Sequence, residues 1–226
     1  MIDLAGGRVV HATGGDRRSY PAIRSVLSDS DLPTEIIAGF LRVHPFTRLY
    51  IADLDALCGR DDQTPVIAEL AGRFPQIELW VDAGFATMDQ LLRWQSLQIG
   101  TAVLGSETIG PGLLAALVGQ QDDYILSLDY RQGRLLGGAD DTVSPSLWPA
   151  RVIVMSLDHV GHHAGPDFDR LQRLKIGNPQ HNLYAAGGVR HADDLHRLQA
   201  LGLAGALLAS ALHSGAIDSH TMPFVP

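Results

Sequence analysis

Two aspartates, Asp3 and Asp129, stand where acid–base chemistry would need them. Each ends a strand-like apolar run, and the two runs open corresponding halves of the chain. A carboxyl group in a partly desolvated site has its pKa raised toward neutrality while a better solvated one stays ionised, so such a pair supplies one acid and one base. Aspartate also follows strands as a cap or turn former. The matched positions favour the functional interpretation, and we expect both residues to be catalytic.

A glycine pair, Gly187-Gly188, follows another strand-like run and could bind an anion. Glycines let bare backbone N–H groups converge on a phosphate where a helix begins. Ala209-Ser210, after the next strand-like run, could complete the site with a hydroxyl. Turns need glycine in any case, so the pair alone does not decide the matter. Its place at a strand end leads us to expect phosphate binding there.

The first half of the chain carries an equivalent group, Gly84, Gly105 and Ser106. Only one glycine remains in this turn, and Asp82 stands beside it. A carboxylate makes the site less favourable for an anion, so we expect weaker phosphate binding on this side.

Other polar residues follow the remaining strand-like runs. Alternation of side chains lets only one of Asp53 and Asp55 point into a common site. Substrate contacts and loop-fixing hydrogen bonds both stay open for these residues and for Asp158. We take Asp53, Ser156 and Asp158 as candidate substrate contacts.

Three histidines, His159, His162 and His163, lie in one glycine-containing loop. They lack the fixed helical spacing of metal ligands, so we expect no metal there. Solvated loop histidines or a substrate contact, His162 above all, are the alternatives.

Strand-like and helix-like segments alternate along the chain, which is typical of a parallel sheet with crossover helices. We predict strands near 2–4, 49–52, 77–81, 102–104, 124–128, 152–155, 183–185 and 206–208, and helices near 33–43, 65–74, 88–97, 112–120, 167–175 and 192–201. Residues 140–149 supply at most a short helix.

An internal repeat relates the two halves. A shift of 104 residues aligns 84–106 with 188–210 without a gap, and nine of the 23 positions are identical. A doubled (β/α)4 unit closes naturally into a ring, whereas an open doubly wound sheet gives its third strand no reason to mirror its seventh. We therefore predict a single domain over residues 1–226, an α/β (β/α)8 TIM barrel of two similar halves. Active sites of this fold lie at the carboxyl ends of the strands.

Composition excludes several other classes of protein. The 226 residues carry 17 Lys and Arg against 25 Asp and Glu, a net charge of -8. The chain therefore lacks the excess of positive charge with which proteins bind the nucleic-acid backbone. No apolar stretch suits a membrane span or a secretory signal. Cys58 is the single cysteine, which fits a reducing, cytoplasmic location. We expect a monomer or small homo-oligomer with a phosphorylated small-molecule substrate.

Several motifs now combine into a recognisable set. They are Asp3 with Gly7-Arg8-Val9-Val10, Ala52-Asp53-Leu54-Asp55, Gly105-Ser106-Glu107-Thr108, Leu128-Asp129, Ser156-Leu157-Asp158, Ala186-Gly187-Gly188-Val189 and Leu208-Ala209-Ser210. Together they resemble the histidine-biosynthesis barrel family, whose enzymes are the ProFAR isomerase and the cyclase subunit of imidazole glycerol phosphate synthase. The resemblance covers essentially the whole chain.

The resemblance implies roles for the matched residues. Asp3 corresponds to the general base and Asp129 to the general acid of an aminoaldose-to-aminoketose isomerisation. The family's substrate has a phosphate at each end, bound by the loops of the two halves, and its isomerisation needs no metal or redox cofactor.

The match to either enzyme is mixed. Gly15-Asp16 and the ends of the second and fourth strands are similar to the isomerase, whereas Ser156-Leu157-Asp158 and Ala209-Ser210 look more like the cyclase. Such a mixture suggests a third branch. Residues 9–21 resemble a paralogous group of methanogens and methylotrophs that is associated with tetrahydromethanopterin-type one-carbon carriers.

Four departures bear on function. The first glycine turn is reduced to Asp82-Ala83-Gly84-Phe85, Val160-Gly161-His162 replaces the family's Asp-Gly-Thr, and a Trp often found in isomerases is missing from residues 135–138. Only two residues precede Asp3, so we expect the true start or an omitted segment upstream. Three hypotheses stay open: an isomerase, a paralogue in one-carbon cofactor biosynthesis with one phosphate site, and a non-catalytic barrel that binds a phosphorylated ligand.

Overall fold

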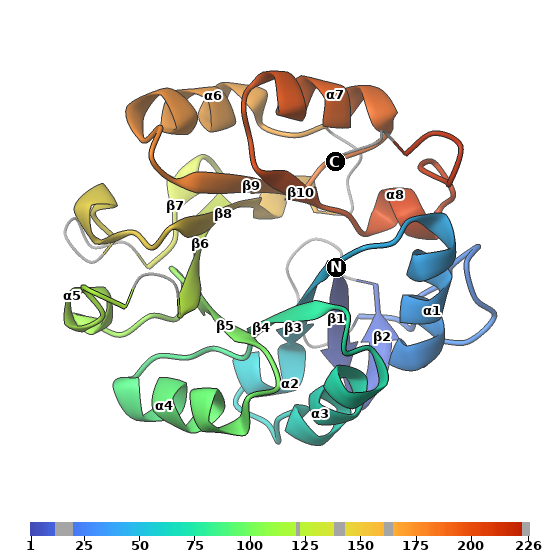
Figure 1. The fold of residues 1–226 in the computed structure, drawn as a ribbon, viewed down its shortest axis with the longest axis horizontal. Helices are drawn as coiled ribbons and strands as arrows, with labels where there is room; N and C mark the ends of the chain where they lie inside the picture. Colours follow the sequence, from blue (N-terminus) through green and yellow to red (C-terminus); the bar gives the residue numbers. More distant parts are fainter. Residues whose placement is uncertain (12–19, 121–122, 138–142, 161–164, 223–226) are drawn as a thin grey trace.

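The computed structural model describes residues 1–11, 20–120, 123–137, 143–160 and 165–222. Its centre is a curled, mainly parallel sheet with strand order β10-β9-β8-β6-β5-β4-β3-β1-β2, and β7 pairs with β6 outside this series. Figure 1 shows the sheet curving round so that its two ends approach each other.

All eight predicted strands are present within a few residues of their expected bounds. They are β1 (Ile2–Ala5), β3 (Arg48–Asp53), β4 (Glu78–Asp82), β5 (Thr101–Gly105), β6 (Tyr124–Arg131), β8 (Arg151–Ser156), β9 (Asn182–Ala186) and β10 (Gly205–Leu207). The neighbours in this series pair in parallel.

Two further strands were not predicted, β2 (Arg8–Val10) and β7 (Arg134–Leu135), and each forms an antiparallel hairpin with β1 or β6. Their two-residue turns, Gly6-Gly7 and Gln132-Gly133, have positive φ at both positions. That backbone suits the twist of a tight hairpin and explains the glycines.

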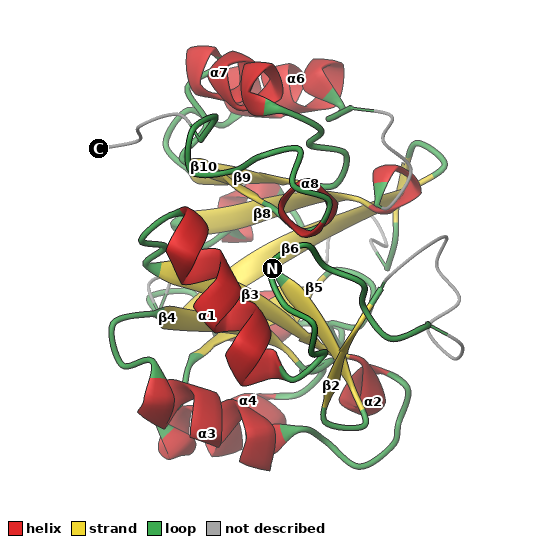
Figure 2. Cartoon of the chain, turned by 90° about the vertical axis from the view of Figure 1, so that its right-hand side faces the viewer, coloured by secondary structure: helices red, strands yellow, loops and turns green. Residues whose placement is uncertain are grey.

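Helices cover the outer face of the sheet, as Figure 2 shows. The longer ones are α1 (Pro33–Val43), α3 (Thr64–Arg73), α4 (Met88–Leu97), α6 (Phe168–Gly177) and α7 (Ala192–Ala200); the short ones are α2 (Leu54–Leu57), α5 (Leu113–Ala116), α8 (Ser210–His213) and the 3-10 turns η1 (Pro145–Leu147) and η2 (Leu157–His159). The helix predicted at 112–120 is only the four residues of α5, because Gly112 and Gly119 have positive φ on either side of it.

Side-chain alternation divides the core into two layers. In β3, Leu49 and Ile51 pack outward against the helices, whereas Tyr50 and Ala52 join an inner cluster enclosed by the sheet. Polar residues that share the inner face therefore point into the same enclosed space.

The ends of the parallel series meet at β1 and β10. The amino group of Met1 donates a hydrogen bond of 2.6 Å to the carbonyl oxygen of Leu208. The curled sheet with its outer helices is an α/β fold consistent with a (β/α)8 barrel.

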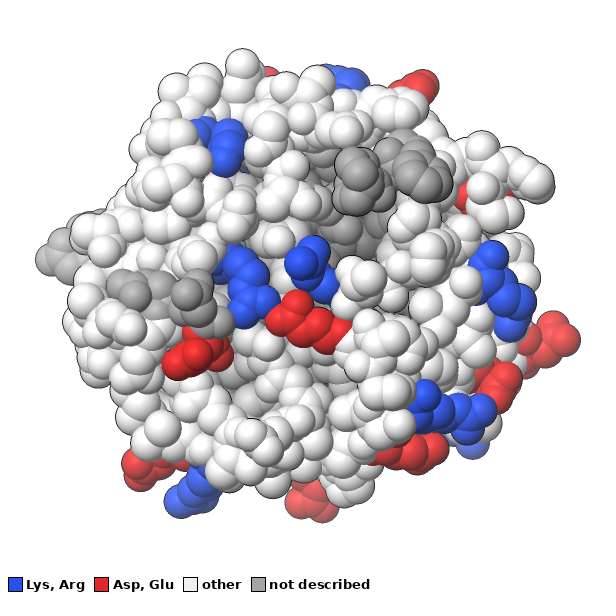
Figure 3. Space-filling model, viewed as in Figure 1, with Lys and Arg blue, Asp and Glu red and all other residues white. Residues whose placement is uncertain are grey.

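A partly exposed ion-paired cluster lies near the amino ends of the strands. Glu78 accepts hydrogen bonds from Arg151 at 2.6 Å and Arg48 at 3.4 Å, and both guanidinium groups lie within 6 Å of the Trp80 ring centroid. On the face shown in Figure 3, basic and acidic side chains lie together near the centre and are otherwise scattered. Within the described residues, no helix is both long and apolar enough to span a bilayer.

Candidate active site

The two predicted catalytic aspartates lie on β1 and β6, but neither ends its strand as predicted. The hairpins extend β1 to Ala5 and β6 to Arg131, so Asp3 and Asp129 lie within the ladders. A sequence pattern that marks a parallel strand does not reveal such an antiparallel extension.

Asp129 is almost completely buried, with 7% of its surface exposed. The hydroxyl of Ser127 donates to its Oδ1 at 2.7 Å, and its own backbone N–H donates to the Ser106 hydroxyl at 2.9 Å. Its Oδ2 has only longer contacts, 3.5 Å to Ser106 Oγ and 3.4 Å to the Glu107 N–H. Oδ2 is therefore the weakly bonded oxygen and the better place for a transferable proton.

Burial, together with the nearby Asp82 carboxylate, raises the pKa of Asp129 to about 7, against the hydrogen bonds from Ser127 and Glu107 that lower it. A carboxyl group that titrates near neutrality can hold and release a proton under ordinary conditions, which is the property of a general acid.

Tyr50 relates Asp129 to Asp3. Its side chain is buried on the inner face. Burial raises the pKa of its hydroxyl, and the charges of Asp82, Asp129 and Asp3 raise it further. All three carboxylates thus act on one buried hydroxyl, so Asp3 and Asp129 both lie near Tyr50.

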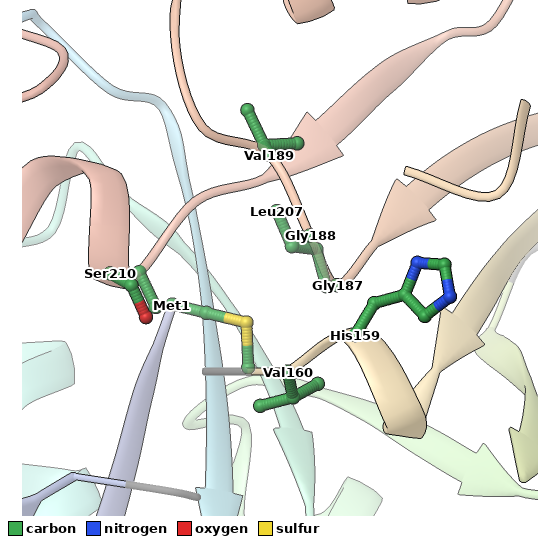
Figure 4. Close-up of a pocket in the computed structure, with 9 residues that line it drawn as sticks. Met1, His159, Val160, Gly187, Gly188, Val189, Leu207 and Ser210 are labelled. Atoms are coloured by element: carbon green, nitrogen blue, oxygen red, sulfur yellow. The ribbon is translucent and has the colours of Figure 1, made fainter. Parts of the chain in front are cut away.

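A pocket at the ends of β9 and β10 brings together Gly187, Gly188, Ala209 and Ser210, the four residues predicted to bind phosphate in the second half. In Figure 4, Ser210 lies next to Met1, the glycines stand across the opening, and the His159 ring turns away. His159 Nδ1 instead lies 2.6 Å from the Gly165 carbonyl oxygen. Among the described residues that line the pocket there is no carboxylate.

Backbone donors in this pocket are available. Among the described residues, the N–H groups of Gly188, Val189 and Ser210 form no hydrogen bond. An adjoining pocket shares Met1, Val160, Ala209 and Ser210 with the first and adds Asp3, His11 and His213 to its lining. Asp3, the expected base, and Ser210, the expected phosphate-binding hydroxyl, therefore line the same pocket.

Both glycines are also required by the fold. Gly187 and Gly188 have φ of +93° and +89°. A Cβ on Gly187 would lie 2.5 Å from the Ser156 carbonyl oxygen, and one on Gly188 would clash with the Gly165 carbonyl. The needs of the turn thus suffice to account for the pair, and the free N–H groups are the observation that points to an anion.

The first-half group has a different arrangement. The Gly84 N–H already donates to Asp82 Oδ1 at 3.1 Å. Ser106 is fully buried, and its hydroxyl is bonded to Asp129. A Cβ on Gly105 would lie 3.1 Å from Asp129 Oδ2 and 3.5 Å from Asp82 Oδ2, so two carboxylates occupy this side.

A sequence profile of the family described as "Histidine biosynthesis protein" matches residues 1–218. The chain belongs to this family.

Relatives in the family span the whole chain at modest identity. An uncharacterized protein of Methanocaldococcus jannaschii is 27% identical over 96% of this chain and 93% of its own. A phosphoribosyl imidazole-4-carboxamide isomerase of Gemmatimonas aurantiaca is 26% identical over 98% and 95% of the two chains, and one of Thermus thermophilus is 29% identical over 96% and 94%.

The sequence left open whether Asp53 contacts the substrate or fixes a loop, and its hydrogen bonds in the structure are those of a loop-fixing residue. It is fully buried, and its carboxylate accepts backbone hydrogen bonds from Ala56 at 3.0 Å and Gln63 at 2.6 Å. Asp55 likewise accepts from the Gly6 N–H at 2.7 Å and pairs with Arg60 at 2.7 Å.

The other candidate substrate contacts, Asp158 and Ser156, also have partners within the chain. Asp158 is exposed and accepts a hydrogen bond from the Gln132 N–H in the β6–β7 turn. Ser156 is buried, and its carbonyl oxygen lies against Gly187. His162 and the family motif Gly15-Asp16 lie outside the described residues. No cluster of three or more metal-ligating side chains is found in the described part of the chain.

The sequence interpretation missed two interior residues, Tyr50 and Ser127. The inner-face position of Tyr50 follows from its alternation with Ile51, a signal that was present in the sequence. The bond from Ser127 to Asp129, two positions along the same strand face, was equally open to inference.

Proposed function

We propose that the chain is an isomerase that converts an aminoaldose to an aminoketose on a metabolite with a phosphorylated sugar. The proposal includes a closed eight-stranded ring of two similar halves. The matching hairpins that extend β1 and β6 support that duplication, because they occur at equivalent strands.

Asp129 is the general acid of this reaction. Its proton passes to the ring oxygen of the sugar, the bond from that oxygen to C1 breaks, and the nitrogen lone pair forms a C1–N double bond. The observation that carries the proposal is the buried Asp129 carboxyl with a pKa of about 7, because a proton donor must be loaded at neutral pH.

Asp3 is the general base. It removes the C2 proton, the electron pair forms the C1–C2 double bond and neutralises the nitrogen, and C1 then takes a proton as the C2 carbonyl forms. Asp3 lines the pocket that adjoins the phosphate residues, which suits a base acting on a sugar anchored there.

The substrate phosphate binds the N–H groups of Gly188, Val189 and Ser210, with the Ser210 hydroxyl as a further donor. The first-half group takes no phosphate, because the Asp82 carboxylate would repel it. This asymmetry favours a second candidate within the same chemistry: a paralogue whose metabolite has one phosphate, in place of the bis-phosphoribosyl substrate that the family's isomerases use.

Turnover in D2O tests the proposal. The protein is incubated with two probes, the relatives' imidazole carboxamide substrate and an N-aryl ribosylamine 5-phosphate, and the products are examined by NMR. Isomerisation puts one deuterium on C1 of the aminoketose. We expect turnover of at least the single-phosphate probe, and its loss in Asp129→Asn and Asp3→Asn by a factor of roughly 10²–10⁴ or more.

Complementation separates the two candidates. Growth of a ProFAR-isomerase-deficient host without histidine, rescued by this protein, would favour the bisphosphate substrate. Binding of both probes with no turnover of either would favour a non-catalytic phosphate-binding barrel and contradict the proposal.

A further inference from the structure

Asp82 and Asp129 are two carboxylates that face one point from adjacent parts of the interior. Gly105, the last residue of β5, lies between β4 and β6, and a Cβ there would lie 3.1 Å from Asp129 Oδ2 and 3.5 Å from Asp82 Oδ2. The missing side chain at Gly105 leaves the two oxygens facing each other.

The Asp82 carboxylate is held in place by two donors. The Tyr50 hydroxyl donates to its Oδ2 at 3.2 Å, and the Gly84 N–H donates to its Oδ1 at 3.1 Å. Oδ2 is the same atom that faces Asp129. Two donors stabilise a carboxylate, so this member of the pair is equipped to carry the negative charge.

Asp129 is equipped to carry the proton. Its Oδ2 has only contacts of 3.4 Å or more, whereas its Oδ1 is satisfied by Ser127. When two carboxylates share a buried site, they do not both ionise readily, and the proton stays on the one whose facing oxygen has the longer, weaker contacts.

The internal repeat gives an independent reason to single out Asp82. The shift of 104 residues that aligns Gly84 with Gly188 pairs Asp82 with Ala186. The second-half turn thus has a methyl group where the first-half turn has a carboxylate. The N–H groups of Gly84 and Ser106 donate to Asp82 and to the Ser127 carbonyl oxygen, whereas those of Gly188 and Ser210 form no hydrogen bond among the described residues.

We propose that Asp82 is a positioning residue for Asp129: tethered by Tyr50 and Gly84, it faces Asp129 across Gly105 and makes Asp129 the carboxyl that carries the catalytic proton. The first-half turn then positions the general acid, Asp129, and does not bind a second phosphate. This inference rests on the proposed function, in which Asp129 is the general acid.

The titratable groups that act on or are acted on by Asp129 come from three neighbouring parts of the sheet. They are Asp82 on β4, Glu107 after β5 and Tyr50 on β3, and the charge of Asp3 on β1 also acts on Tyr50. On β8, the register neighbour of Asp129 is the uncharged Met155. Of the two acidic groups that raise the pKa of Asp129, Asp82 has the larger effect and Glu107 the smaller. Removing the Asp82 charge should therefore change the titration of Asp129 most.

Carbon-13 NMR of aspartate carboxyl groups in the full chain tests the proposal, with the Asp129 signal assigned by its absence in Asp129→Asn. Asp82→Asn should lower the titration midpoint of Asp129 by about one pH unit or more, because a like charge is removed. Tyr50→Phe should lower it as well, because the proton then moves toward Asp82. Asp89→Asn, an exposed acid on α4, is the matched control and should leave the midpoint unchanged.

An unchanged Asp129 midpoint in folded Asp82→Asn overturns the inference, whatever the enzyme turns over. Should Asp82→Asn fail to fold, Tyr50→Phe decides by the same criterion. Absence of phosphate binding at Gly188 and Ser210 would instead overturn the proposed function and leave the Asp82–Asp129 coupling standing.

Discussion

Asp3 and Ser210 line the same pocket, although they stand near opposite ends of the chain. The meeting of β1 with the segment after β10, through the hydrogen bond from Met1 to Leu208, brings them together. A sugar whose phosphate is bound by Ser210 would therefore have its carbon chain near the proposed base.

The first prediction concerns Ser210. Ser210→Asp should weaken binding of inorganic phosphate by roughly tenfold or more, because the new carboxylate occupies the anion pocket. Calorimetric titration measures the effect. Ser219→Asp, an exposed serine beyond α8, makes the same charge change and should leave the affinity near that of the wild type. Equal weakening by both variants would show a general charge effect.

The second prediction concerns pH and Asp129. Its pKa is about 7 in the folded chain against 3.8 ordinarily, so the unfolded chain loses this proton first as pH rises. The folded state is therefore destabilised progressively from about pH 4 to about pH 7, by on the order of 4 kcal/mol at most. An asparagine at this position cannot ionise, so the Asp129→Asn variant does not lose this stability as pH rises.

The Tm of Asp129→Asn relative to the wild type should consequently be higher at about pH 8 than at about pH 5. Scanning calorimetry of both proteins at both pH values measures the difference. A Tm difference that is the same at the two pH values would mean that Asp129 titrates normally.

The third prediction concerns the glycine turn. Gly188→Ala should destabilise the protein by more than the cost of about 1–2 kcal/mol for a positive φ alone, because the new methyl group clashes with the Gly165 carbonyl. Gly59→Ala is the control, since Gly59 also has a positive φ of +69° but open space around it. Equal losses in urea unfolding would contradict the clash.

The fourth prediction concerns Asp53. Asp53→Ala should lower the free energy of unfolding by about 1–3 kcal/mol, because two backbone N–H groups lose their acceptor. Phosphate affinity should stay unchanged, because Asp53 fixes a loop. A variant with normal stability and impaired binding would assign Asp53 to the substrate instead.

The strands and the longer helices could be predicted because apolar periodicity and helix-starting residues such as Pro33 and Thr87 mark them locally. The hairpins β1–β2 and β6–β7 were missed because their signal is only a two-residue turn. The grouping of Gly188 with Ser210 followed from the repeat, which carries three-dimensional information along the chain.

The roles of individual carboxylates were less predictable. Asp53, Asp82 and Asp129 all follow apolar runs, and nothing local separates a loop-fixing carboxylate from a proton donor. The difference lies in their partners: Asp53 accepts backbone hydrogen bonds at both oxygens, whereas Asp129 faces Asp82 across Gly105. Such pairings depend on register between strands far apart in sequence.

The central claim is that a single phosphate anchors the substrate at Gly188 and Ser210 while Asp3, Asp82 and Asp129 handle the proton. Electron density from crystals soaked in inorganic phosphate tests it most directly. The account predicts one phosphate bonded to the N–H groups of Gly188 and Ser210. Phosphate bound between Gly84 and Ser106, or bound at neither place, would contradict it.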